Sequence, residues 1–119
     1  MAVKYSNNAS TTINGAITAA ATSITVNDAS EFPTLTGSDY TYLTLSTLDA
    51  TTIEVIKVTA INTSTKVLTV IRGQDDTTGA IFSSGDICEL RLNAAMLNDA
   101  ASQNDDASGT AVAMSIALG

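Results

Sequence analysis

The stretch 67–92, VLTVIRGQDDTTGAIFSSGDICELRL, decides how the chain is expected to fold. It opens with the apolar, β-branched run 67–71 and closes with the alternating run 87–92. β-Branched side chains fit a pleated surface, and alternation turns one face of a strand inward, so both runs predict strands. The polar segment 72–86 between them predicts a long presented loop, and its Gly85-Asp86 turn brings the chain back.

Alternation and turn residues predict further strands before this unit. They are expected at 11–13, 22–26, 39–47 and 53–60. Residues 62–66 predict a turn, so the strands on either side of it should form an antiparallel hairpin. Phe32, beside the single proline, is expected to fill the core. In the strand 53–60, the charged Glu54 and Lys57 are expected to be exposed.

The strand 39–47 carries a pair of tyrosines on one face. Its alternation places Leu43 and Leu45 toward the core, with Tyr40 and Tyr42 on the outward face. Two tyrosines on an outward face suggest a contact between subunits. The alternative is that they pack against an extended N-terminal arm formed by residues 1–12.

The C-terminal part divides into a helix, a linker and an apolar segment. Residues 93–101 predict a short helix in which Asn93 is the N-cap, because its side chain can accept from free backbone N–H groups. We therefore expect a β-domain over 1–101, and a polar linker with an apolar end over 102–119. That end should cover an edge of its own domain or of a neighbouring subunit. Its candidate contact residues are Val112, Met114, Ile116 and Leu118.

Length and composition predict one folded domain. The chain has 119 residues, of which 45% are hydrophobic and 14% are charged. Regularly spaced short strands predict a mainly β fold, a small antiparallel β-barrel or sandwich, with one short helix near the C-terminus.

The charged and reactive residues exclude several classes of function. A net charge of −7, with only five scattered basic residues, argues against a nucleic-acid partner. The absence of histidine and the single Cys88, expected to be a buried apolar side chain, leave no catalytic triad, no histidine-type zinc site and no internal disulfide. No apolar run approaches the roughly 20 residues that span a membrane, and no signal sequence is visible. We expect neither enzyme activity nor a cofactor.

The loop offers candidate contact residues. Arg72 ends a strand and is expected to brace the loop through carbonyl groups or through Asp75 and Asp86, or else to form an ion pair across a subunit interface. Asp75, Asp76 and Asp86 could bind a hard cation, but their spacing matches no calcium loop. The loop tip is either solvated or in contact with a partner protein. Its candidate contact residues are Gln74, Asp75, Asp76, Thr77 and Thr78.

The run 70–97, VIRGQDDTTGAIFSSGDICELRLNAAML, resembles a segment of a family of tailed-bacteriophage virion proteins, V-R-G-Q-E-G-T-T … F-S-x-G-D … E-L-R-x-T-A-A-x-L. These are tail-fibre, tail or capsid-decorating proteins. The resemblance extends to KYSNNASTT (4–12), AATSITV (20–26), Phe32-Pro33, Tyr40 and EVIKVT (54–59), and so covers most of the chain up to Asp99. Where the family carries a glycine after the acidic residue, this chain has Asp76.

The resemblance implies a structural component of a tailed-phage particle, made in the cytoplasm of the host bacterium and carried on the virion. Such proteins usually form symmetric homo-oligomers, commonly homotrimers. The implied partners are copies of itself and other virion proteins, such as the major capsid protein or tail proteins. Because the chain stops soon after the resembling part, a capsid decoration or cement protein is the first expectation, and a tail-fibre or tail-adaptor protein is the alternative. A carbohydrate-binding β-module is an outside alternative.

Overall fold

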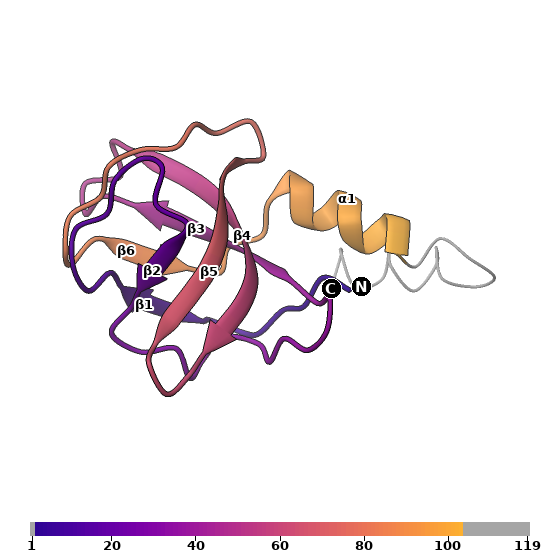
Figure 1. Cartoon of the computed structure of the whole chain (residues 1–119). Helices are drawn as coiled ribbons and strands as arrows, with labels where there is room; N and C mark the ends of the chain where they lie inside the picture. Colours follow the sequence, from indigo (N-terminus) through magenta and orange to yellow (C-terminus); the bar gives the residue numbers. More distant parts are fainter. Residues whose placement is uncertain (1, 104–119) are drawn as a thin grey trace.

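A computed structural model describes residues 2–103, which form six strands and one helix (Figure 1). The elements are β1 (Ser10–Thr12), β2 (Ser23–Thr25), β3 (Thr41–Ser46), β4 (Ile53–Asn62), β5 (Val67–Gln74), β6 (Ile87–Glu89) and α1 (Ala94–Gln103). The strands make one antiparallel sheet in the order β1-β6-β3-β4-β5-β2. The prediction of a mainly β fold with one short helix near the C-terminus is confirmed.

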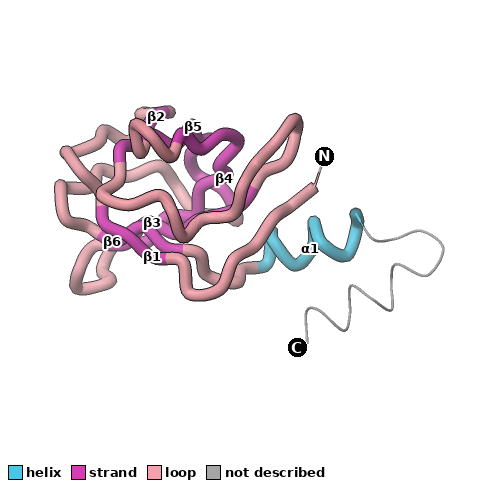
Figure 2. Tube along the Cα trace, turned by 90° about the horizontal axis from the view of Figure 1, so that it is seen from below, coloured by secondary structure: helices cyan, strands magenta, loops and turns pink. Residues whose placement is uncertain are grey.

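Figure 2 shows the sheet curling from β2 through β5 and β4 to β3, β6 and β1, and the chain beyond the two edge strands pairs to close it. Just beyond β1 and β2, Ile13 and Val26 form an antiparallel bridge, and the Asn27 N–H donates to the Thr12 carbonyl over 3.0 Å. This bridge satisfies backbone groups that an open sheet edge would expose. The architecture is therefore a curled, barrel-like sheet rather than two stacked layers.

The hairpin β4–β5 is the longest paired unit of the sheet. Its turn is closed by the Lys66 N–H, which donates to the Asn62 carbonyl over 2.7 Å, as the polar segment 62–66 predicted. The pairing shifts register between Val55 and Lys57, and again between Val58 and Ala60. Such irregularities increase the local bend and twist of a strand, which suits a long strand that must follow a curled sheet.

The core lies inside the curled sheet and is built from alternate residues of its strands. Leu43 and Leu45 of β3 face inward, as predicted, and are fully buried. Phe82 is the largest fully buried side chain of the described residues, and Phe32 also joins the core as predicted. Cys88 is fully buried, and this burial raises the pKa of its thiol to about 12, so it is the inert apolar residue that was expected.

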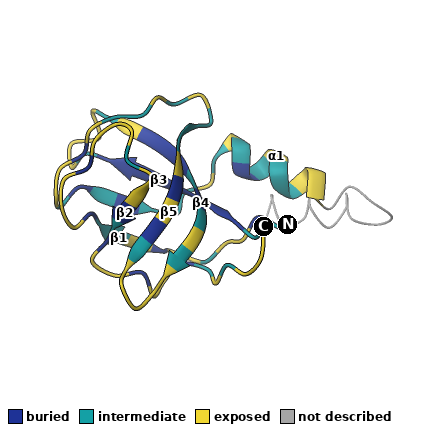
Figure 3. Cartoon of the chain, viewed as in Figure 1, coloured by how far each residue is buried: buried dark blue, intermediate teal, exposed yellow. Residues whose placement is uncertain are grey.

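Strand β3 is buried on both faces (Figure 3). Its outer face is covered by α1 and by the N-terminal segment, where Val3 forms a parallel bridge with Tyr40 (Figure 1). A second apolar cluster fills this space. It consists of Val3, Tyr40, Tyr42, Val55 and Met96.

One sequence prediction for this region needs correction. Tyr40 and Tyr42 lie on the face opposite Leu43, as expected, but they are only 4% and 5% exposed, so that face is not open. The alternative of packing against the N-terminal arm holds in part, because Val3 belongs to the cluster. The sequence reasoning had not paired the tyrosines with α1.

The helix begins where the sequence predicted. The Asn93 side-chain oxygen accepts from the Met96 N–H over 2.8 Å, and the Asp75 carboxylate accepts from the Ala95 N–H over 3.0 Å. These bonds satisfy two of the free N–H groups of the first turn. The helix continues to Gln103, two residues past the predicted boundary at 101. The rest of the predicted linker and the contact residues Val112, Met114, Ile116 and Leu118 lie outside the described residues.

A tight turn follows β5. The Thr77 N–H donates to the Gln74 carbonyl over 3.0 Å, and the two residues between them, Asp75 and Asp76, have φ of 52° and 61°. Both are in the left-handed region, which favours glycine. The turn therefore forms even though Asp76 stands where the resembling family has a glycine.

Asp76→Gly is expected to stabilise the domain by roughly 0.5–1 kcal/mol. The left-handed conformation costs a non-glycine residue about 1–2 kcal/mol, and the entropy lost by fixing glycine offsets part of the gain. The free energy of unfolding, measured by urea titration, would check this.

Asp75→Gly is the matched control, because it relieves the same backbone conformation one residue earlier. It also removes the carboxylate that binds the Ala95 N–H, so no net stabilisation is expected. Equal gains from both variants would show that the bond to α1 contributes nothing.

Candidate functional site

Arg72, predicted to end a strand, lies within β5, which continues to Gln74, and its side chain points into the barrel. Its side chain is 8% exposed and forms a bidentate ion pair with Glu54 of β4. The two N–O distances are 2.8 Å from Nε to Oε2 and 2.7 Å from Nη2 to Oε1. We call the end of the barrel where β4 begins and β5 ends the ion-pair end.

The remaining N–H groups of Arg72 bind backbone carbonyls of two loops. Nη1 donates to Thr18 over 2.6 Å and to Ala21 over 3.1 Å, and Nη2 donates to Ala80 over 2.6 Å. With the pair to Glu54, all five guanidinium N–H groups have acceptors. Arg72 therefore fixes two separate loops to the end of β5.

Glu54 is fully buried and equally well satisfied. Besides Arg72, its carboxylate accepts from the backbone N–H groups of Gly73 and Ala80, both over 2.9 Å. Each carboxylate oxygen thus accepts two hydrogen bonds. A buried charge is tolerated only when it is paired and hydrogen-bonded in this way.

This pair corrects one prediction and refines another. Glu54 was expected to be exposed because it is charged, and that is wrong, since alternation puts it on the same inward face as Ile56. Internal bracing by Arg72 through carbonyl groups is confirmed, but its carboxylate partner is neither Asp75 nor Asp86. Asp86 accepts from the Ser83 N–H over 2.8 Å instead.

Most other predicted contact residues of the loop also bond internally. The Gln74 amide donates to the Arg72 carbonyl over 3.1 Å. The Thr77 hydroxyl accepts from the Val55 N–H over 2.9 Å and donates to the Gln74 carbonyl over 2.6 Å. Asp76 and Thr78 are exposed. The loop is therefore mainly framework, and these two side chains remain open to solvent.

The tyrosines meet α1 through one carboxylate. The hydroxyls of Tyr40 and Tyr42 both donate to Asp99 Oδ2 over 2.7 Å, and the two rings pack edge to face with centroids 5.7 Å apart. Lys57 Nζ lies 4.2 Å from the centre of the Tyr40 ring. The Gln103 side chain donates to the Tyr40 hydroxyl and accepts from the backbone of the N-terminal segment.

Tyr40 and Tyr42, which the sequence suggested as a contact between subunits, therefore have partners within their own chain. Sequence reasoning missed Asp99 and Gln103 as their partners. The available signal was helical spacing, because Met96, Asp99 and Gln103 recur at intervals of three and four on one helix face.

The network also changes how the tyrosines titrate. Burial, followed by the hydrogen bond and negative charge of Asp99, raises the pKa of Tyr40 to about 12. The same causes raise the pKa of Tyr42. Both environments favour the neutral phenol, because a tyrosinate would be partly desolvated and would face a carboxylate.

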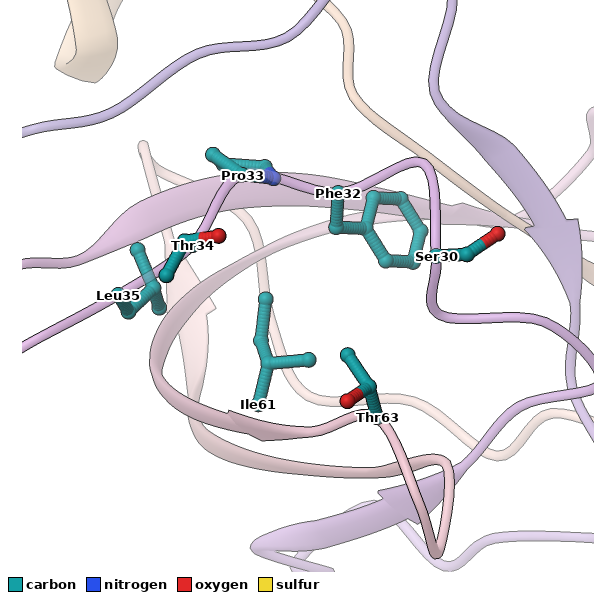
Figure 4. A pocket seen from close by; sticks show the side chains of 7 residues that line it. All are labelled: Ser30, Phe32, Pro33, Thr34, Leu35, Ile61 and Thr63. Atoms are coloured by element: carbon teal, nitrogen blue, oxygen red, sulfur yellow. The ribbon is translucent and has the colours of Figure 1, made fainter.

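A shallow cleft opens elsewhere, between the segment 30–35 and the end of β4 (Figure 4). It is lined by Ser30, Phe32, Pro33, Thr34, Leu35, Ile61 and Thr63, and its volume is about 200 Å³. Ligand pockets typically hold about 300–1,000 Å³. The cleft offers hydroxyl and apolar groups but no ionisable side chain among its lining residues.

Residues 2–103 contain no group of three or more histidine, cysteine or acidic side chains placed to hold a metal ion. None of the helical structure described there has the length and apolar character needed to cross a membrane.

No protein-family model matches the chain, and no curated protein matches it. These comparisons add no family to the resemblance found in the sequence.

Arg72→Met is expected to destabilise the domain by about 3–5 kcal/mol, because it leaves the Glu54 carboxylate buried without its partner. The free energy of unfolding in urea measures the loss. Arg91→Met is the matched control, since it breaks the other ion pair of the described chain, where the arginine is 41% exposed, and should cost under about 1 kcal/mol.

The double variant Glu54→Leu/Arg72→Met tests whether the domain is stabilised by the ion pair alone or also by the bonds that the pair makes to backbone groups. Apolar replacement of a whole buried pair is often neutral. Here it would orphan four backbone groups, each of which costs about 1 kcal/mol or more, so the double variant should stay destabilised. They are the N–H groups of Gly73 and Ala80 and the carbonyls of Ala21 and Ala80. The Thr18 carbonyl would keep its bond from the Ala21 N–H, over 3.3 Å. Recovery to wild-type stability would show that these bonds contribute little.

The tyrosine network should lose stability in alkali. The folded pKa of Tyr40 is above its ordinary value of 10, so its contribution is complete below pH 10 and disappears as the pH rises through about 12. Tyrosinate absorbance of the folded protein should therefore rise late, whereas the urea-unfolded chain should titrate near 10. Asp99→Asn should lower the folded midpoint by removing the facing charge. A folded midpoint near 10 in the wild type would contradict the network.

Proposed function

We propose that the protein is a structural component of a tailed-phage particle, in the first place a capsid decoration protein that acts as a symmetric homo-oligomer through protein–protein contacts. The observation that carries the proposal is the resemblance of the run 70–97 to phage virion proteins. In the fold, this run supplies several of the contacts that hold the structure together. It contains Arg72, the turn at Asp75 and Asp76, the core residue Phe82 and the first turn of α1.

The way the resembling residues are used supports an architectural role. Arg72 holds two loops, Asp75 holds the start of α1, and Asp86 holds the turn before β6. A module that joins a particle by surface complementarity needs such a rigid frame, because ordering loops on binding would weaken the association. Its action would be mechanical and would involve no turnover.

Two alternatives remain as separate proposals. A tail-fibre or tail-adaptor protein could use the same module as an attachment domain, since the resembling family includes tail proteins. A carbohydrate-binding module would need a surface for sugars, and the shallow cleft beside Phe32 is the place to look for it (Figure 4). Its one aromatic side chain is 7% exposed, which gives little stacking surface.

The copy number per purified particle distinguishes capsid from tail. Quantitative mass spectrometry against the major capsid protein should give on the order of hundreds of copies, because a decoration protein repeats with the symmetry of the lattice.

Other results have distinct meanings. A copy number from a few to a few dozen would assign the protein to the tail or to a vertex and overturn the capsid proposal. Absence from purified particles, together with specific binding on a glycan array, would reject the particle role in favour of the carbohydrate-binding alternative.

A further inference from the structure

Three large aliphatic side chains of the described residues are exposed at the ion-pair end. Leu48, in the turn between β3 and β4, is 75% exposed, Ile53 is 46% exposed, and Ile81, in the loop before β6, is 73% exposed. We call these three residues the apolar end patch. Exposed apolar side chains that gather on one region often mark a protein–protein contact.

Backbone pairing places these three residues on neighbouring segments. Ser46 of β3 pairs with Ile53 on one side and with Ile87 on the other. The Ala80 N–H, next to Ile81, binds the Glu54 carboxylate, next to Ile53. The turn after β3 and the segment that leads into β6 therefore lie together at this end, where both loops can be followed in Figure 1.

Both neighbours of Ile81 in the sequence are held in place, while its own side chain is exposed. On one side, Ala80 is fixed to both partners of the buried ion pair. On the other side, Phe82 is 1% exposed and exchanges backbone hydrogen bonds with Ile17, over 2.9 and 3.3 Å. With both neighbours fixed, Ile81 is preorganised, so little backbone entropy would be lost when a partner covers it.

Exposed acidic side chains lie at the same end of the barrel. Asp49 and Asp76 are exposed at this end, and hydrogen bonds from Thr51 and Thr47 lower the pKa of Asp49. Of the five basic side chains, Arg72 lies at this end, and it is buried in its pair with Glu54. The others lie beside Tyr40, in the β4–β5 turn and near Glu89, and they are Lys4, Lys57, Lys66 and Arg91.

We propose that the apolar end patch docks into an apolar depression on another particle protein whose rim carries lysine or arginine side chains. This inference rests on the proposed particle function and names the surface and the chemistry of its partner. A second copy of the same patch would bring two sets of acidic side chains into one interface, and like charges oppose association. A basic rim would complement them around an apolar centre, which is the common anatomy of an interface.

The test adds the purified protein back to particles of the encoding phage that were prepared without it. Leu48→Ser/Ile81→Ser should weaken particle binding by at least about tenfold, the effect of losing one well-packed anchor. Asp76→Lys should also weaken binding, and its effect should shrink as the salt concentration rises. The control is Ile71→Ser, which removes an aliphatic side chain, 48% exposed, from the side of β5, and should bind like the wild type.

The outcomes separate this inference from the proposed function. Thermal unfolding of each variant establishes that it is folded before binding is compared. If Leu48→Ser/Ile81→Ser binds the particles as tightly as the wild type does, the proposed docking surface is wrong and the particle function stands. Wild-type protein that binds no particle would overturn the particle function and the docking surface with it. Sedimentation of the same proteins measures self-association. If self-association is lost only in Leu48→Ser/Ile81→Ser, the patch is a contact between copies, and docking on another protein is overturned.

Discussion

The buried pair of Glu54 and Arg72 is the constraint around which this small barrel is arranged. Two charges inside a β-barrel are costly to desolvate, and they persist here because every N–H of the guanidinium and both carboxylate oxygens have partners. Those partners include backbone groups of the segments 18–21 and 73–80, so the pair replaces regular strand pairing as the closure of one end. The loops at that end are held by these electrostatic contacts and hydrogen bonds, as well as by the core packing of Ile17 and Phe82.

A second constraint acts on β3, whose two faces are both covered. The inner face supplies Leu43 and Leu45 to the core, and the outer face supplies Tyr40 and Tyr42 to the cluster under α1. The helix is attached at both ends, through Asp75 near its start and through Gln103 at its end. The turn that follows β5, close to Arg72, therefore also positions α1, so the curled sheet and the helix are coupled through this turn.

Local signals in the sequence were enough for the strands, the β4–β5 hairpin and the N-cap at Asn93. They failed where a residue's partner is distant in sequence. Glu54 was placed outside because of its charge, although alternation with Ile56 put it inside, and its partner Arg72 lies 18 residues later. Asp99 was not singled out at all, because nothing local shows that a carboxylate on a helix will meet phenols 57 and 59 residues earlier.

The same reasoning explains why the predicted contact loop has to be viewed differently once it is folded. A segment rich in aspartate, threonine and glutamine looks like a recognition surface when only its polarity is considered. In the fold, Gln74, Asp75 and Thr77 use their side chains for internal bonds, so their polarity serves the frame. What internal bonding leaves available is different in kind, with aliphatic Leu48 and Ile81 outside and the exposed Asp76 at the same end of the barrel. A surface for a partner is better sought among groups that the fold does not consume than among groups that look reactive in sequence.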